Sequence, residues 1–201
     1  VLNLHAVGSA QDYHQTFSAV AGATASAPAR ATERLTFEQF INTTHRAFNG
    51  QFTRPIGKVT MILGGDVHRT DSAQDELRFV LVSGVNTKTG PFASGGIETV
   101  NAVYGRANVA VTDAITVELG ARADHWKSDP HDPALKTKEV NYLSPRAAIS
   151  ARVGRYQLQA STYYANRTPT LNELFRRFAV GNQVTNANEL LEPERLKGVE
   201  G

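Results

Sequence analysis

Apolar and polar side chains alternate along several stretches of this chain with a period of two residues. In the clearest run, 115–124 (ITVELGARAD), the odd positions are apolar and the even positions are mostly polar. The same alternation recurs in 59–68, 143–153 and 156–165. A period of two places successive side chains on opposite faces of a β-strand, and helical spacing does not fit it.

Four further segments alternate with interruptions. They are 2–20, 43–53, 96–111 and a last strand that starts near Pro193. Together with the clear runs they predict an all-β chain, folded as an antiparallel meander of about eight strands.

The links between these strands fall into two length classes. Three are tight and rich in turn residues: 54–57, 112–114 and 153–155. Four are long: 21–42, 72–95, 127–139 and 166–192. Short and long links alternate, whereas ordinary globular domains have mostly short ones. Tight turns at one end and long loops at the other are typical of a transmembrane β-barrel with tight periplasmic turns and long extracellular loops.

One strand face carries too many polar side chains for a dry core, for example Glu118, Arg122, Arg146 and Gln157. In a soluble sandwich this face would meet water, and in a barrel it would meet a wet lumen or a plug. The pattern alone leaves both possibilities open. The alternation of short and long links and the length of the strands favour the barrel over a first alternative, a secreted soluble β-sandwich for binding or adhesion. A passive porin is a second alternative, within the barrel class.

Composition narrows the class of protein. The chain has 201 residues, 41% hydrophobic and 20% charged, which is typical of a folded protein. A formal net charge of +2 gives no argument for nucleic-acid binding, and the absence of cysteine excludes disulfides and thiolate chemistry. No run of 18 apolar residues exists, and the first residues do not form a signal peptide. Both ends read as cuts through a larger protein.

Two stretches carry a family resemblance. The first, GGIETVNAVYGRANVAVTDAITVELGARADHW, contains the Arg-x-Asp pair at Arg122 and Asp124. The second, 141–201, opens a strand with LSPR, turns tightly, leaves the membrane at YYANRTPTLNELF and returns at PE. This order resembles the TonB-dependent outer-membrane receptors. The resemblance is densest over 96–201 and extends to 43–70.

The resemblance implies part of a large, plugged barrel of about 22 strands. On this view residues 1–201 are a partial barrel, with the plug domain, the TonB-contacting segment and the C-terminal strands absent. It implies active import of a scarce nutrient, such as a ferric siderophore or a similar chelate, across the outer membrane of a Gram-negative bacterium. The implied partners are TonB, reached through the plug, the small-molecule ligand and the lipids of the outer membrane. A partial barrel has two edge strands, so we expect an open, curved sheet.

The long link around 168–195, TPTLNELFRRFAVGNQVTNANELLEPER, has its own local signals. Thr170 and Glu173 form a capping box that predicts a short helix after Pro169. Pro193 then marks the restart of a strand. We expect this connection to stand above the membrane, where a ligand arrives.

Within that link, Arg176, Arg177 and Phe178 are the candidate ligand-binding residues. Two guanidinium groups beside an aromatic ring suit an anionic, planar chelate, because arginine binds carboxylates in a bidentate fashion and stacks on flat rings. The competing interpretation ranks higher: these residues pack the loop onto its neighbours or bind lipopolysaccharide phosphates.

The sequence evidence for metal binding or for catalysis is weaker than the evidence for a ligand-binding loop. A group of acids and histidines suggests a metal site: Asp124, His125, Asp129, His131 and Asp132. Their spacing matches no standard zinc or calcium loop, so we predict a solvated turn and no metal or other cofactor. The sequence has no G-x-S-x-G elbow and no phosphate-cradling loop, and we predict that the protein is not an enzyme.

Overall fold

The computed structural model describes residues 1–22, 25–176, 178–180 and 183–201. Its main feature is one eight-stranded sheet whose order follows the sequence, β1-β2-β3-β4-β5-β6-β7-β10. The strands are β1 (Leu2–Val20), β2 (Glu33–Ile56), β3 (Val59–Val82), β4 (Val85–Ala110), β5 (Ile115–Pro130), β6 (Lys138–Val153), β7 (Tyr156–Arg167) and β10 (Glu194–Glu200). All neighbours pair antiparallel, which confirms the predicted meander.

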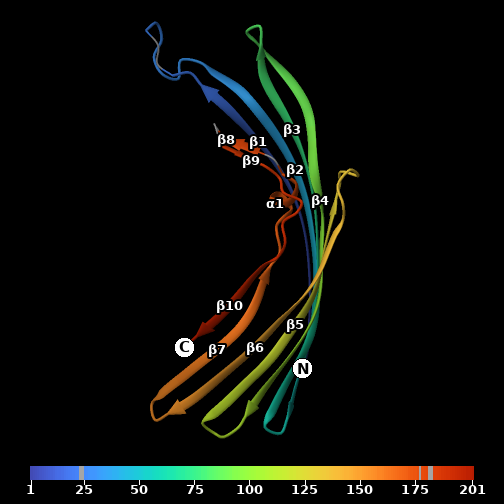
Figure 1. Cartoon of the computed structure of the whole chain (residues 1–201), viewed down its shortest axis with the longest axis vertical. Helices are drawn as coiled ribbons and strands as arrows, with labels where there is room; N and C mark the ends of the chain where they lie inside the picture. Colours follow the sequence, from blue (N-terminus) through green and yellow to red (C-terminus); the bar gives the residue numbers. More distant parts are fainter. Residues whose placement is uncertain (23–24, 177, 181–182) are drawn as a thin grey trace.

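The sheet is a single curved layer with β1 and β10 as its edges (Figure 1). The connection between β7 and β10 lies inside the curve and contains α1 (Leu171–Phe175), β8 (Phe178–Val180) and β9 (Gln183–Thr185). A β-sandwich needs two packed sheets. The soluble sandwich alternative is therefore wrong for this fold. No helix in the described part of the chain is long and apolar enough to cross a membrane.

Strand pairing puts the two predicted faces on opposite sides of the sheet. The concave face holds the even positions of β5, including Trp126, which is buried against α1. The convex face holds the odd positions, where Leu119 is 56% exposed. Its apolar band covers the five outward positions from Ile115 to Ala123. Nine residues is the strand length that crosses a bilayer in a tilted barrel.

Three of the four predicted long loops are shorter than expected, because the strands continue into them. The segment 72–95 is a hairpin in which β3 runs to Val82 and β4 starts at Val85. Ser83 and Gly84 form its turn with positive φ angles of 49° and 81°. The links at 21–42 and 127–139 shrink to 21–32 and 131–137 for the same reason.

The sequence pattern made these three loops too long for a physical reason. Beyond the apolar band both faces of a strand meet water, so backbone pairing continues while the alternation of side chains fades. The sequence pattern therefore marks where a strand leaves the apolar band, and it does not mark where the strand ends. The fourth link remains long, as predicted, running from Arg167 to Glu194.

Candidate ligand-facing site on the concave face

The helix α1 is fixed to the concave face by an apolar cluster. Trp126 of β5 is fully buried and packs with Leu171, Leu174 and Phe175 of α1. Gly96 of β4 allows the close approach, because a Cβ atom there would lie 2.7 Å from the Phe175 ring. The long connection thus folds back into the curve of the sheet (Figure 1), rather than simply standing above it as the sequence suggested.

The capping box predicted from the sequence is present. The Glu173 amide donates to Thr170 Oγ1 at 3.3 Å, and the Thr170 amide donates to Glu173 Oε2 at 2.8 Å. These bonds satisfy two of the amide groups left unpaired at the start of a helix. They explain how a helix of five residues has a defined start.

Arg167, the last residue of β7, ties both ends of the connection together. Its guanidinium donates to Glu173 at 3.1 and 3.2 Å and to Glu194 at 2.9 and 3.0 Å. The Arg167 guanidinium, together with hydrogen bonds from Thr170, lowers the pKa of Glu173 to about 2. Because Glu194 opens β10, this arginine joins the outgoing strand, the helix and the returning strand.

The return leg of the connection is anchored separately. Lys138 Nζ of β6 donates to the carbonyl oxygens of Leu190 and Leu191 at 3.0 and 2.8 Å. The backbone amide of Asn188 donates to the backbone carbonyl of Glu173 at 3.1 Å. The connection is therefore held to the wall at several points along its length.

Of the three predicted ligand residues, the structure describes the side chain of one. Arg176 reaches across the concave face to β2, where its Nη2 donates to Gln39 Oε1 at 2.8 Å. Arg177 lies outside the described residues, and so does the side chain of Phe178, whose backbone opens β8. The contact with Gln39 is of the loop-packing kind that we ranked above ligand contact.

Gln39 belongs to a polar network that continues across the wall. It is fully buried, accepts from Gln15 of β1, and donates to Glu76 Oε2 of β3 at 2.8 Å. Arg78 Nε donates to Glu76 Oε1 at 2.6 Å. Arg176 therefore docks the connection onto a wall whose polar groups already bond to one another.

A second network lies at the level of the apolar band. Arg122 of β5 donates to both carboxylate oxygens of Asp66 of β3, at 2.6 and 2.9 Å. It also donates to Asp124 at 2.8 Å, and His68 lies 3.0 Å from Asp66. Asp66 and Asp124 are 7% and 6% exposed. The sequence singled out Arg122 and Asp124 as an Arg-x-Asp pair, but it did not predict their meeting with Asp66, which depends on strand register.

The suspected metal group is not assembled. His125 lies on the convex face and bonds Asn141 at 2.9 Å, while Asp124 lies on the concave face with Arg122. His131 pairs with Asp71 at 3.1 Å. Among the described residues, no group of three or more His, Asp and Glu side chains could hold a metal ion.

Comparison with known proteins gives one family and several solved structures. Residues 2–201 match the family model "TonB dependent receptor-like, beta-barrel". No curated protein sequence matches the chain significantly. A solved structure titled "Copper transporter OprC" aligns with a TM-score of 0.76 at 13% identity, covering 98% of this chain and 32% of the other.

A second solved structure is BauA, the ferric preacinetobactin receptor from Acinetobacter baumannii. It aligns with a TM-score of 0.57 at 12% identity, over 98% of this chain and 31% of the other. The chain thus spans about a third of the length of these two proteins. At such low identity the likeness concerns the fold.

Proposed function

Because this chain belongs to the TonB-dependent receptor family and forms part of its β-barrel domain, we propose that it is the wall of an outer-membrane import receptor. The protein takes up a scarce nutrient in a step energised through TonB. The observation that carries the proposal is the match to the family model over residues 2–201. The geometry supports it, since the convex face carries an apolar band suited to lipid and the concave face carries a hydrogen-bonded polar wall.

The wider architecture is part of the same proposal. An open sheet exposes unpaired backbone groups at β1 and β10, and a bilayer cannot satisfy them. Further strands of a larger barrel would pair with these edges. A plug domain filling the lumen would contact the concave wall and carry the segment that TonB binds. The chain spans about a third of its two structural neighbours, which leaves room for both parts.

For the cargo we propose a ferric siderophore or a similar metal chelate. The titles of the two neighbours, a copper transporter and a ferric preacinetobactin receptor, support a metal-related cargo. Arg176, Arg177 and Phe178 are the proposed contacts. Arg176 supports this role because it lies where the connection crosses the interior face toward β2.

Uptake by the intact receptor tests the function. A host strain lacking the gene is supplied with the full-length gene, and accumulation of radioactive iron from a panel of ferric chelates is measured. The proposal expects uptake of at least one chelate that disappears when TonB is deleted. Uptake that persists without TonB would instead support the passive porin.

A further inference from the structure

A hollow of about 580 Å³ lies on the concave face, between the wall and the start of the connection that carries α1. Several segments line it: His45, His68 and Glu98 belong to β2, β3 and β4, whereas Tyr142 belongs to β6 and Thr168 follows β7. Ligand pockets in proteins usually have a volume of about 300–1,000 Å³, so the hollow has room for a small ligand.

Two histidines of this hollow stand close together. His45 of β2 is the register partner of Thr70, and His68 lies two residues from Thr70 on β3, so both imidazoles are on the concave face. Their ring centroids are 6.1 Å apart, with 32° between the ring planes. The pair lies beyond the apolar band, because Asp66, two residues before His68, is already level with Asp124, which follows the band on β5.

Each of the two rings has one nitrogen fixed by an oxygen atom and one nitrogen left over. Nε2 of His68 lies 3.0 Å from Oδ2 of Asp66, a carboxylate that Arg122 also binds. Nδ1 of His45 lies 3.0 Å from Oγ1 of Thr70. Within the part of the chain that the structure describes, Nδ1 of His68 and Nε2 of His45 have no hydrogen-bond partner. In metal sites a ligating histidine typically donates its other N–H to an oxygen partner such as a carboxylate.

One metal ion can bridge two imidazoles at this separation. An ion about 2.1 Å from a nitrogen of each ring would lie about 3.2 Å from each ring centroid, so it can join rings whose centroids are up to about 6.4 Å apart. The observed 6.1 Å falls within that reach. Both rings are accessible from the hollow, since the His68 side chain is 45% exposed and His45 is half-buried.

A carboxylate without a cation lies beside the histidine pair. Glu98 of β4 is the register partner of Thr70, in the same row as His45. Among the described residues, no Lys, Arg or His nitrogen lies within 4.0 Å of the Glu98 carboxylate. Burial raises the pKa of Glu98, and the electrostatic effect of His68 opposes this rise only in part. A divalent cation at the pair would supply the compensating charge.

We propose that this hollow binds a divalent first-row transition metal ion through the imidazoles of His45 and His68. Imidazole is a preferred ligand of copper, nickel and zinc, and Cu²⁺ binds nitrogen ligands most tightly of these three ions. The described residues assemble no third ligand, so the remaining positions are open to water or to donor atoms of a carrier molecule. An open site suits cargo that must be released, whereas a resident structural metal is retained by a closed set of ligands.

The biological role of the site rests on the proposed function, since a metal bound for import needs the transport step. The site narrows the cargo to a metal whose carrier leaves coordination positions free for two imidazoles. Metal binding is measured on the purified receptor, and uptake is measured on whole cells. Uptake without metal binding at the pair would refute this inference alone, and metal binding without TonB-dependent uptake would refute the proposed function alone.

Titration of Cu²⁺ into the full-length receptor in detergent, followed by electron paramagnetic resonance, tests the inference. Pulsed spectra distinguish one bound imidazole from two through the remote ring nitrogens. The expected result is a bound Cu²⁺ with two imidazoles. His45→Gln and His68→Gln are each expected to leave a single imidazole in the spectrum. Each should weaken binding by about tenfold or more, the loss that even the outer partners of metal ligands cause.

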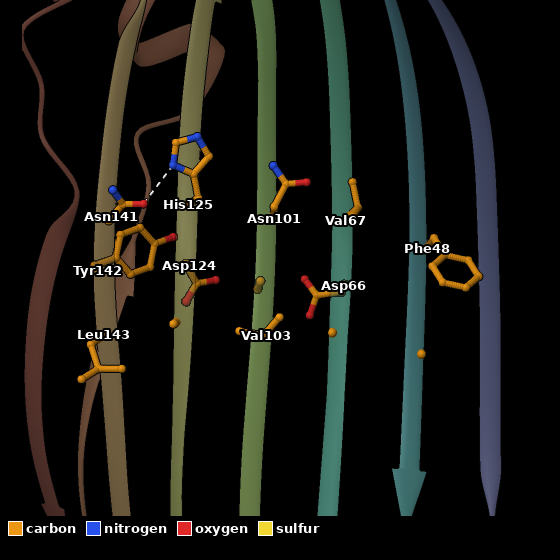
Figure 2. A pocket seen from close by; sticks show the side chains of 14 residues that line it. Phe48, Asp66, Val67, Asn101, Val103, Asp124, His125, Asn141, Tyr142 and Leu143 are labelled. Atoms are coloured by element: carbon orange, nitrogen blue, oxygen red, sulfur yellow. Dashed lines mark hydrogen bonds between the residues drawn. The ribbon is translucent and has the colours of Figure 1, made fainter.

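The matched control is His125→Gln. His125 lies on the convex face and bonds Asn141 at 2.9 Å, as the dashed line in Figure 2 shows. Its substitution is expected to leave the Cu²⁺ spectrum and affinity unchanged. Glu98→Gln removes a charge without removing an imidazole, so we expect about tenfold weaker binding with both imidazoles still in the spectrum.

Three outcomes would overturn the inference. The first is the absence of a two-imidazole spectrum in the unaltered receptor, which needs no variant to fold. The second is a two-imidazole spectrum that survives in the double variant of His45→Gln and His68→Gln, because the copper would then be bound by other histidines. The third is an equal loss of affinity in the His125→Gln control.

Discussion

Arg122 of β5 reaches over the intervening strand β4 to bind Asp66 of β3 through two hydrogen bonds of 2.6 and 2.9 Å. On β4, the register partner of Arg122 is Tyr104, and the residue between Asp66 and Asp124, the two acids that the guanidinium bonds, is Ala102. A methyl group leaves room for the guanidinium to pass. One small residue thus allows a single cation to bridge β3 and β5 across β4.

Removal of that cation is expected to destabilise the barrel. Arg122→Ala leaves the carboxylates of Asp66 and Asp124 largely buried and without the cation that they share, at an expected cost of about 2–4 kcal/mol in the free energy of unfolding. Denaturant unfolding of the full-length receptor in lipid vesicles measures this cost. Addition of Asp66→Asn should recover part of it, and a double variant no better than the single one would contradict the account.

A larger side chain at Ala102 provides a second test of the bond between Arg122 and Asp66. Ala102→Leu is expected to displace Arg122 and cost about 1–3 kcal/mol through overpacking. The matched control is Val103→Leu, the next residue of β4, which is 66% exposed on the convex face. Its effect should stay within about 0.5 kcal/mol. Similar costs at both positions would show that the concave packing described for Ala102 is wrong.

The lipid-facing assignment predicts an asymmetry between the two faces. Leu119→Arg places a charge in the middle of the convex apolar band, with an expected cost of about 2–4 kcal/mol in a bilayer. Gln157→Arg on the concave face of β7 should be mild. Refolding yield and denaturant stability in vesicles measure both. Equal sensitivity of the two positions would contradict the membrane placement of the convex face.

Docking of α1 should depend on pH through Glu173. The Arg167 guanidinium and the Thr170 bonds lower the pKa of this carboxyl from 4.5 to about 2. A group whose pKa is lower in the folded state stabilises that state above the unfolded pKa, and the stabilisation disappears as the pH falls. We expect α1 to loosen from the wall as pH falls from 4.5 toward about 2.

The reporter for this transition is Trp126, the single tryptophan of the chain, which is fully buried beneath α1. Its indole can be labelled with fluorine and followed by NMR, with Trp126→Phe assigning the signal. Glu173→Gln should remove the change between pH 4.5 and about 2. A variant that still titrates like the parent would assign the effect to another group.

The proposed ligand contacts have their own test. Arg176→Ala together with Arg177→Ala is expected to weaken chelate binding by the full-length receptor, measured by calorimetry on whichever chelate is taken up. Gln39→Ala is the control, because it removes the wall partner of Arg176 and leaves both arginines. Unchanged affinity in the double variant would remove both arginines from the site. An equal loss in the control would reduce Arg176 to a loop-packing role.

The sequence by itself determined the order of the eight strands in the large sheet, their two faces and the start of α1. These features depend on neighbours one to four residues apart: alternation decides which side of β5 is apolar, and Thr170 with Glu173 decides where the helix begins. Such local signals are readable because backbone geometry sets the periods of strands and helices.

The tertiary structure decided everything that depends on register or on distant contacts. β3 and β4 continue as a hairpin to a turn near Ser83. Both faces of this hairpin meet water, so its side chains do not alternate between apolar and polar and the sequence pattern does not reveal it. The bond from Arg176 to Gln39 spans 137 residues, and that between Arg122 and Asp66 spans 56. Pairing register creates these sites, and it depends on the exact geometry of each turn as well as on the apolar pattern of the strands.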